Sequence, residues 1–298
     1  MIAIHLAALL TALTIQAAQP PAPSENVARA EKLIQSGNVA EAIGLLEETI
    51  KATPQAFDAH LALGRALDLE GRHAQARRHL EQAISLAPAD RRNQALTAMG
   101  ISWAFESKPD EAARYYQRVY DAYIQANDRN GAAGIANALG RIYLESGNWA
   151  KAEQWYRTGY ETSKQIPEQS AATLALWEMR WHNAQGRIAA RRGDRRKALE
   201  HAAQVKALLD KGGNEGQQQF YPYLLGYIAL YARDYKQAIA ELEKGDLEDP
   251  FVAGLLAQAY DRTGDRAKAR EYSTAVMADT SHSINNAFAR PSARRYLR

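Results

Sequence analysis

Residues 57–90 of this chain, FDAHLALGRALDLEGRHAQARRHLEQAISLAPAD, decide its fold. Small and apolar residues recur at helical spacing around Gly64 and again around Ala76, and Pro88 ends the second run. Between the two runs lies Gly71, where a chain reversal needs a residue that can adopt a positive φ angle. Two antiparallel helices approach closely only where their facing side chains are small. The stretch therefore predicts a helical hairpin that crosses at Gly64 and Ala76.

The same pattern recurs along the chain, as a small residue followed twelve positions later by alanine. The pairs are Ala30/Ala42, Gly64/Ala76, Gly100/Ala112, Gly140/Ala152, Gly186/Ala198, Gly226/Ala238 and Ala257/Ala269. In five of them a turn glycine follows the first small residue, at Gly37, Gly71, Gly147, Gly193 and Gly264. Ser107 and Arg233 occupy this position in the third and sixth units. The recurrence predicts an all-α chain of stacked antiparallel helix hairpins.

A helix–turn–helix unit of about 34 residues resembles the tetratricopeptide repeat. The resemblance covers residues 23–283, with repeats that begin near residues 23, 57, 93, 133, 179, 219 and 250. It implies a right-handed α-solenoid, in which neighbouring repeats bury one continuous core and form one elongated domain. The middle repeats are the longest, which is similar to the peptide-sensing and kinesin-light-chain-like branches of this family.

The first residues predict where the protein is sent. Residues 1–18 are an apolar run without a charged side chain, and a proline-rich linker follows at 19–24. This order is typical of a secretory signal peptide, here with cleavage near Ala17 or Ala18. We therefore expect an exported chain that is periplasmic or secreted. An uncleaved N-terminal anchor is the alternative, although the run is short for a membrane span and contains threonine and glutamine.

Composition narrows the possible partners. The sequence has no cysteine, which excludes disulfides and a lipid-modified cysteine at the mature N-terminus. No later segment has the length and apolarity of a membrane span, so we expect no stable membrane insertion of the mature chain. The formal net charge of +3 is too small to indicate a nucleic-acid partner.

No catalytic constellation stands out. The sequence has no P-loop, no GxGxxG and no HExxH, and its seven histidines show no pair with the usual spacing of metal ligands. We therefore expect no catalytic activity, no metal and no cofactor. An enzyme subunit with a dispersed active site is the alternative from this class.

The resemblance also implies a binding surface. In such superhelices the first helix of each repeat lines a concave groove, and the exposed positions are the residue after the small crossing residue and the residue three before it. The candidate binding residues on this face are Arg65, Asn137, Arg141, Asn183, Arg187, Tyr223, Tyr227 and Gln258. Asparagine amides match a peptide backbone and arginine forks match a carboxylate. The tyrosines would add an aromatic platform.

The expected function is therefore a binding scaffold. Its partner would be a protein or peptide segment that carries an acidic side chain or a C-terminal carboxylate. A peptide or polymer sensor that changes superhelical shape on binding is the alternative. Residues 284–298 are expected to form either a cap on the last repeat, with a helix that starts near Pro291, or a basic tail that docks a partner.

Overall fold

The computed structural model describes residues 23–212 and 214–297, and every regular element in this part of the chain is a helix. The predicted signal peptide lies outside the described residues. No helix in these ranges is long and apolar enough to cross a membrane. The elements are α1 Pro23–Gln35, α2 Val39–Ala52, α3 Phe57–Leu69, α4 His73–Leu86, α5 Arg92–Phe105, α6 Pro109–Gln125, α7 Arg129–Glu145, α8 Trp149–Ser163, α9 Ala171–Arg191, α10 Arg195–Asp210, the 3-10 helix η1 Glu215–Gln217, α11 Phe220–Tyr231, α12 Tyr235–Leu242, α13 Pro250–Thr263, α14 Arg266–Ala278 and α15 Ile284–Tyr296.

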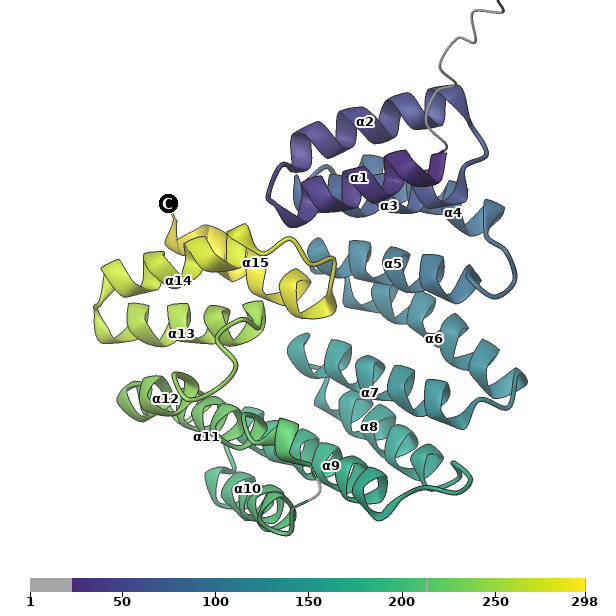
Figure 1. The fold of residues 1–298 in the computed structure, drawn as a ribbon. Coiled ribbons are helices and arrows are strands. Elements are labelled where there is room, and N and C mark those ends of the chain that lie inside the picture. Colours follow the sequence, from purple (N-terminus) through teal and green to yellow (C-terminus); the bar gives the residue numbers. More distant parts are fainter. Residues whose placement is uncertain (1–22, 213, 298) are drawn as a thin grey trace, which may run out of the picture.

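Helices α1 to α14 pack as consecutive antiparallel hairpins, and successive hairpins stack along a curve (Figure 1). This confirms the predicted all-α solenoid. Two first helices begin earlier than expected, α7 at Arg129 and α9 at Ala171. The reason is local, because Asp128 and Ser170 accept hydrogen bonds from the backbone N–H groups of the first turns of α7 and α9.

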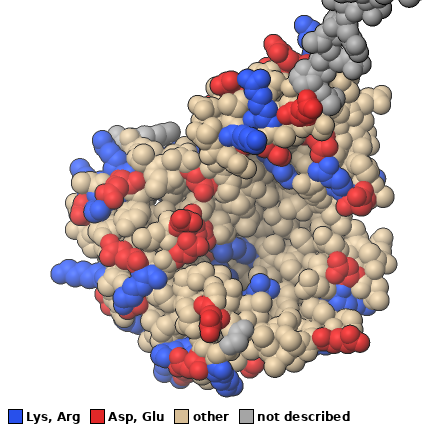
Figure 2. Space-filling model, in the orientation of Figure 1, with Lys and Arg blue, Asp and Glu red and all other residues tan. Residues whose placement is uncertain are grey.

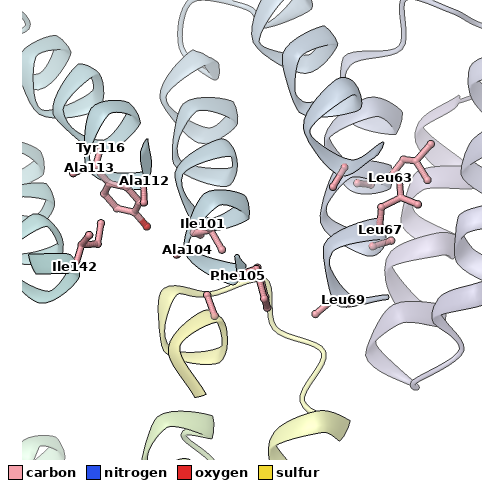
Figure 3. Close-up of a cluster of buried hydrophobic side chains, with 14 of the residues drawn as sticks. Leu63, Leu67, Leu69, Ile101, Ala104, Phe105, Ala112, Ala113, Tyr116 and Ile142 are labelled. Atoms are coloured by element: carbon pink, nitrogen blue, oxygen red, sulfur yellow. The ribbon is translucent and has the colours of Figure 1, made fainter. Parts of the chain in front are cut away.

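Glycine is needed at three helix crossings, because the facing helix leaves no room for a Cβ atom. At Gly64, Gly100 and Gly140, a Cβ atom would come within 2.6 Å of a side chain on the second helix of the same hairpin. The facing side chains are Leu80, Tyr116 and Tyr156. Figure 3 shows Leu63, Leu67, Ile101 and Tyr116 filling the space between successive helices.

The turns adopt the backbone conformation that the glycines predict. The φ angles of Gly37, Gly71, Gly147, Gly193 and Gly264 are 82°, 79°, 86°, 81° and 89°. The third and sixth hairpins keep the same left-handed geometry without glycine, at Ser107 with a φ of 57° and at Arg233 with a φ of 61°. Residues with a Cβ atom are strained in this region.

Replacing Arg233 by glycine is expected to stabilise the protein by about 1 kcal/mol, because the left-handed conformation is free of strain for glycine. Arg233 is exposed, so the change removes little packing. Urea denaturation followed by circular dichroism measures the change. Gly193→Ala is the matched reverse substitution and should lose a similar amount. A loss of stability in Arg233→Gly would contradict the assignment of strain to this turn.

The C-terminal helix closes the curve. Helix α15 packs on α13 and α14 and also on α5, which belongs to the third hairpin (Figure 1). It begins at Ile284 instead of near Pro291, which lies inside the helix. Arg290 is only 4% exposed and donates a hydrogen bond to the carbonyl oxygen of Leu69 at 2.7 Å. Residues 284–297 therefore connect the end of the solenoid to its N-terminal part.

Candidate functional site

A cavity of about 310 Å³ lies between α7, α9, η1 and the first turn of α11. It is lined by Gly134, Asn137, Arg141, Met179, Arg180, Asn183, Arg187, Gln217, Phe220 and Tyr223. Five of the eight predicted binding residues are thus brought together, namely Asn137, Arg141, Asn183, Arg187 and Tyr223. Three arginines and no carboxylate line the cavity. On the face that Figure 2 shows, basic atoms likewise appear inside the central hollow.

Arg187 carries a buried positive charge at this site. The residue is only 5% exposed, and Nη2 of its guanidinium donates a hydrogen bond to the hydroxyl of Tyr156 at 2.9 Å. Nη1 lies 3.5 Å from the hydroxyl of Tyr223. Burial raises the pKa of Tyr156, so this hydroxyl stays neutral and leaves the guanidinium charge in place. Within the described residues, Nε of Arg187 has no hydrogen-bond partner.

Arg141 and Asn183 add further donors without acceptors. Among the described residues, Nε and Nη2 of Arg141 and Nδ2 of Asn183 are buried and have no hydrogen-bond partner. The Arg141 guanidinium stacks over the ring of Phe251, with 4.3 Å from Cζ to the ring centroid. A buried donor left without an acceptor costs about 1–3 kcal/mol. Residues that line the cavity therefore carry buried N–H groups whose hydrogen-bonding capacity is not satisfied within the described residues.

A second polar cluster lies one helical turn further on, and the predicted binding residues include only its Tyr227. Glu145 accepts from Arg191 at 3.1 Å and from the Tyr227 hydroxyl at 3.3 Å, and Arg191 also donates to Tyr231 at 3.1 Å. Burial raises the pKa of Tyr231 to about 12. Glu145, Arg191 and Tyr231 each lie four residues after a predicted groove residue, so extending the groove positions by one turn would have found them.

The expectation that Tyr223 and Tyr227 are an exposed aromatic platform is wrong. Tyr227 is fully buried and Tyr223 is 7% exposed. The cause is the tight curve of the solenoid. It brings Tyr227 of α11 into contact with Glu145 at the end of α7, and it also brings Phe251 into contact with Arg141.

The remaining predicted residues lie elsewhere. Gln258 lines a separate cavity of about 440 Å³, together with Glu145, Arg191 and residues of α15. Arg65 lines neither this cavity nor the one beside Arg187. Its pKa is lowered because the side chain is largely buried. The predicted groove is therefore divided into separate sites.

Arg180, Met179 and Phe220 also line the arginine cavity, although they were absent from the predicted set. Arg180 and Asn183 precede Arg187 by seven and four residues on α9, so all three share one helical face. The signal in the sequence was this spacing, because Arg180 lies one further step along the same face and within the repeat expected to begin near residue 179.

Three family models match the sequence, each described as a tetratricopeptide repeat, at residues 33–100, 91–165 and 250–271. The chain belongs to the tetratricopeptide repeat (TPR) family. No curated protein matches the sequence. Proteins built from TPR units are in general scaffolds that bind other proteins.

Solved TPR structures share the fold at low sequence identity. The nearly identical TPR-like repeats from Podosopora anserina match with a TM-score of 0.53 and 17% identity, over 66% of this chain and 99% of theirs. A TPR protein from Parabacteroides merdae matches with a TM-score of 0.53 and 12% identity, over 85% of this chain and 91% of its own. PilW, a type IV pilus biogenesis factor, matches with a TM-score of 0.50 and 13% identity, over 74% and 91%.

A buried carboxylate ties the C-terminal segment of this TPR protein to α3. Asp68 is fully buried and accepts from Nδ1 of His73 at 2.9 Å and from Nε2 of His282 at 2.8 Å. The hydroxyl of Ser102 donates to it at 2.9 Å. An ionised carboxylate only accepts, so the hydrogen bonds define which ring nitrogen of each histidine carries the proton. The ring of His282 also packs on Phe105, with centroids 5.5 Å apart.

Acid is expected to weaken this connection. Burial lowers the pKa of His282 below 6.5, although Asp68 opposes the effect, and the nearby charge of Arg65 also lowers it. Burial alone would raise the pKa of Asp68, but hydrogen bonds from His282 and His73 lower it below 3.8. A group with a lowered folded-state pKa contributes stability that is present above its unfolded pKa and lost as the pH falls through the folded value. Stability should therefore fall as the pH drops below about 6.5 and fall again in the acid range of Asp68.

Urea midpoints measured between pH 8 and pH 4 test this expectation, and the midpoint should decrease below about pH 6.5. His282→Gln retains a donor to Asp68 and cannot titrate, so its profile should be flatter than that of the wild type between pH 7 and pH 5. Parallel profiles for the two proteins would show that His282 does not cause the loss.

Proposed function

We propose that this chain is an exported TPR scaffold that binds a protein or peptide segment by an acidic side chain or a C-terminal carboxylate in the cavity beside Arg187. The observation that carries the proposal is the lining of this cavity, with Arg141, Arg180 and Arg187 and no carboxylate. Its export rests on the apolar, uncharged run at residues 1–18.

A carboxylate supplies what the cavity lacks. It offers two oxygens that can accept several hydrogen bonds, and the free N–H groups on Arg141, Asn183 and Arg187 need acceptors. Hydrogen bonds between ionised partners are about twice as strong as neutral ones. A bound carboxylate would therefore relieve buried donors and neutralise buried positive charge at the same time.

The size of the cavity limits the ligand. At about 310 Å³ it lies near the lower end of the usual range for ligand pockets. It can take the end of a segment or one acidic side chain, while the rest of the partner stays outside. Met179 and Phe220 form an apolar part of the lining, which favours an apolar residue next to the acidic group.

Binding to two synthetic peptide mixtures tests the proposal. Both contain the same randomised residues, but one has a free C-terminal carboxylate and the other has an amidated C-terminus. Each mixture is prepared in two versions, one with acidic side chains and one without them. Fluorescence anisotropy of labelled peptides should show binding that requires at least one carboxylate. Arg141→Gln should weaken it by at least about tenfold, because it removes charge-assisted hydrogen bonds.

The choice of Arg141 follows from the structure. Arg187 is buried between Tyr156 and Tyr223, so its replacement would disturb the fold. Arg78→Gln is the matched control, since Arg78 is exposed and does not line the cavity. Equal affinity for all peptide mixtures, or equal affinity of the wild type and a folded Arg141→Gln variant, would contradict the proposal.

A further inference from the structure

Two histidine pairs occupy equivalent places in the second and fifth hairpins. Nδ1 of His60 lies 3.1 Å from Nδ1 of His79, and Nδ1 of His182 lies 3.0 Å from Nδ1 of His201. The ring centroids are 5.3 Å apart in both pairs. Neither pair has the usual sequence spacing of metal ligands, so the sequence did not indicate it. Partners that are 19 residues apart in sequence meet because the hairpin places its two helices side by side.

The fold does not require histidine at these places. In each pair, the first histidine lies four residues before the crossing glycine and the second lies three residues after the crossing alanine. The same two positions hold Leu96 and Tyr115 in the third hairpin, and Ala136 and Trp155 in the fourth. Apolar side chains thus serve for packing there, and the paired histidines introduce nitrogen atoms that packing alone does not need.

The two nitrogens of each pair converge on one point. Two Nδ1 atoms about 3 Å apart can share only one proton, so at least one of them presents its lone pair to the other. Imidazole nitrogens bind Zn²⁺ at about 2.0–2.1 Å, so two nitrogens on one tetrahedral ion are about 3.3–3.4 Å apart. The observed separations of 3.1 and 3.0 Å are shorter by a few tenths of an ångström, so a bound ion would lie beside the line between the two atoms after a small rotation of the rings.

We propose that each pair, His60 with His79 and His182 with His201, binds one divalent transition-metal ion of the class that prefers imidazole, such as Zn²⁺, Ni²⁺ or Cu²⁺. Imidazole suits these metals, whereas Mg²⁺ and Ca²⁺ prefer oxygen ligands. The proposal is independent of the peptide-binding function, because none of the four histidines lines the arginine cavity.

The surroundings orient the first pair and leave both pairs accessible. Nε2 of His60 lies 3.0 Å from the carbonyl oxygen of Pro54 and donates to it when Nδ1 carries the lone pair. A histidine that binds a metal usually donates such a hydrogen bond from its second ring nitrogen, and the bond fixes the orientation of the ring. His79, His182 and His201 are partly exposed, so an ion can enter from solvent.

Each pair would be an open site. Within residues 23–212 and 214–297, no group of three or more His, Cys, Asp or Glu residues is placed to hold a metal ion. The two imidazoles would therefore supply only part of the coordination shell, and water or a partner protein would supply the rest.

Neighbouring charges should make the two sites unequal. The charge of Arg72 acts on His79, and a positive charge repels a cation. The carboxylates of Glu178 and Glu200 act on the second pair, beside the single positive charge of Lys197. We therefore expect the pair of His182 and His201 to bind the metal more tightly.

Calorimetric titration of untagged, chelator-treated protein with ZnCl₂, and separately with CuCl₂, tests the proposal. The wild type should bind one ion per pair. His79→Gln and His201→Gln should each lose one ion, and the double variant should lose both, while MgCl₂ gives no binding at these sites. Glutamine can still donate to the remaining imidazole, so the hairpins should keep their packing.

A second measurement guards against an effect of the variants on folding. Electron paramagnetic resonance of the Cu²⁺-loaded wild type should show nitrogen hyperfine coupling from imidazole ligands, and the signal should disappear in the folded double variant. Absence of Zn²⁺ and Cu²⁺ binding by the wild type would overturn the proposal. So would an unchanged stoichiometry in the double variant, since the metal would then lie elsewhere.

Discussion

Replacing Asp68 by alanine is expected to destabilise the protein by about 3–5 kcal/mol, the usual loss when one partner of a buried charged cluster is removed. Asp68 is fully buried, and His73, Ser102 and His282 all donate to it. Without the carboxylate, three buried donors would have no acceptor. Urea denaturation followed by circular dichroism measures the loss.

The same substitution should loosen the C-terminal helix before the rest of the fold. His282 precedes α15, and its hydrogen bond to Asp68 holds that segment on α3. Amide hydrogen exchange in residues 284–296 should therefore accelerate more than in α7 and α8. Asp90→Ala is the control, because Asp90 is exposed. Equal stability of the Asp68→Ala and Asp90→Ala proteins would show that the buried cluster does not stabilise the fold.

Replacing Gly140 by valine is expected to destabilise the protein by about 3 kcal/mol through overpacking at the crossing of α7 and α8. A Cβ atom at Gly140 would lie 2.6 Å from Cγ of Tyr156. The ring of Tyr156 cannot easily move away, because its residue is 3% exposed and its hydroxyl is bound to Arg187 at 2.9 Å. The added methyl groups must therefore separate the two helices.

Gly134 on the same helix provides the matched control. No atom lies within 4 Å of a Cβ atom built there, and the residue is exposed. Gly134→Ala should stabilise the protein by about 0.5–1 kcal/mol, because glycine is less favourable than alanine inside a helix. The two glycines should thus respond in opposite directions to added bulk in urea denaturation. A neutral Gly140→Val protein would mean that the crossing can open without loss.

The repeat units could be predicted because their signals are local. The spacing between Gly64, Gly71 and Ala76 indicates the two sides of one helix crossing and the turn between them. The structure shows the close approach at Gly64 and a φ of 79° at Gly71. Even Ser107, which lacks the expected glycine, keeps the left-handed turn, because packing of the flanking helices outweighs the preference of one residue.

The candidate site was predicted only in part. Groove positions taken from the repeat phase identified Arg141, Asn183 and Arg187, which share one cavity. The same positions also selected Tyr227, which the structure buries completely. Repeat phase determines the helix face of a residue, but the distance to helices several repeats away determines whether that face is open.

The helical hairpins, their crossings and their turns could be predicted because they depend on contacts between residues close along the chain. The closure of the solenoid could not, because in it His282 contacts Asp68 across 214 positions and Arg290 contacts Leu69 across 221. The physical reason is that each repeat adds a small rotation to the solenoid. The sum of these rotations places distant helices together, and no single repeat contains that sum in its own sequence.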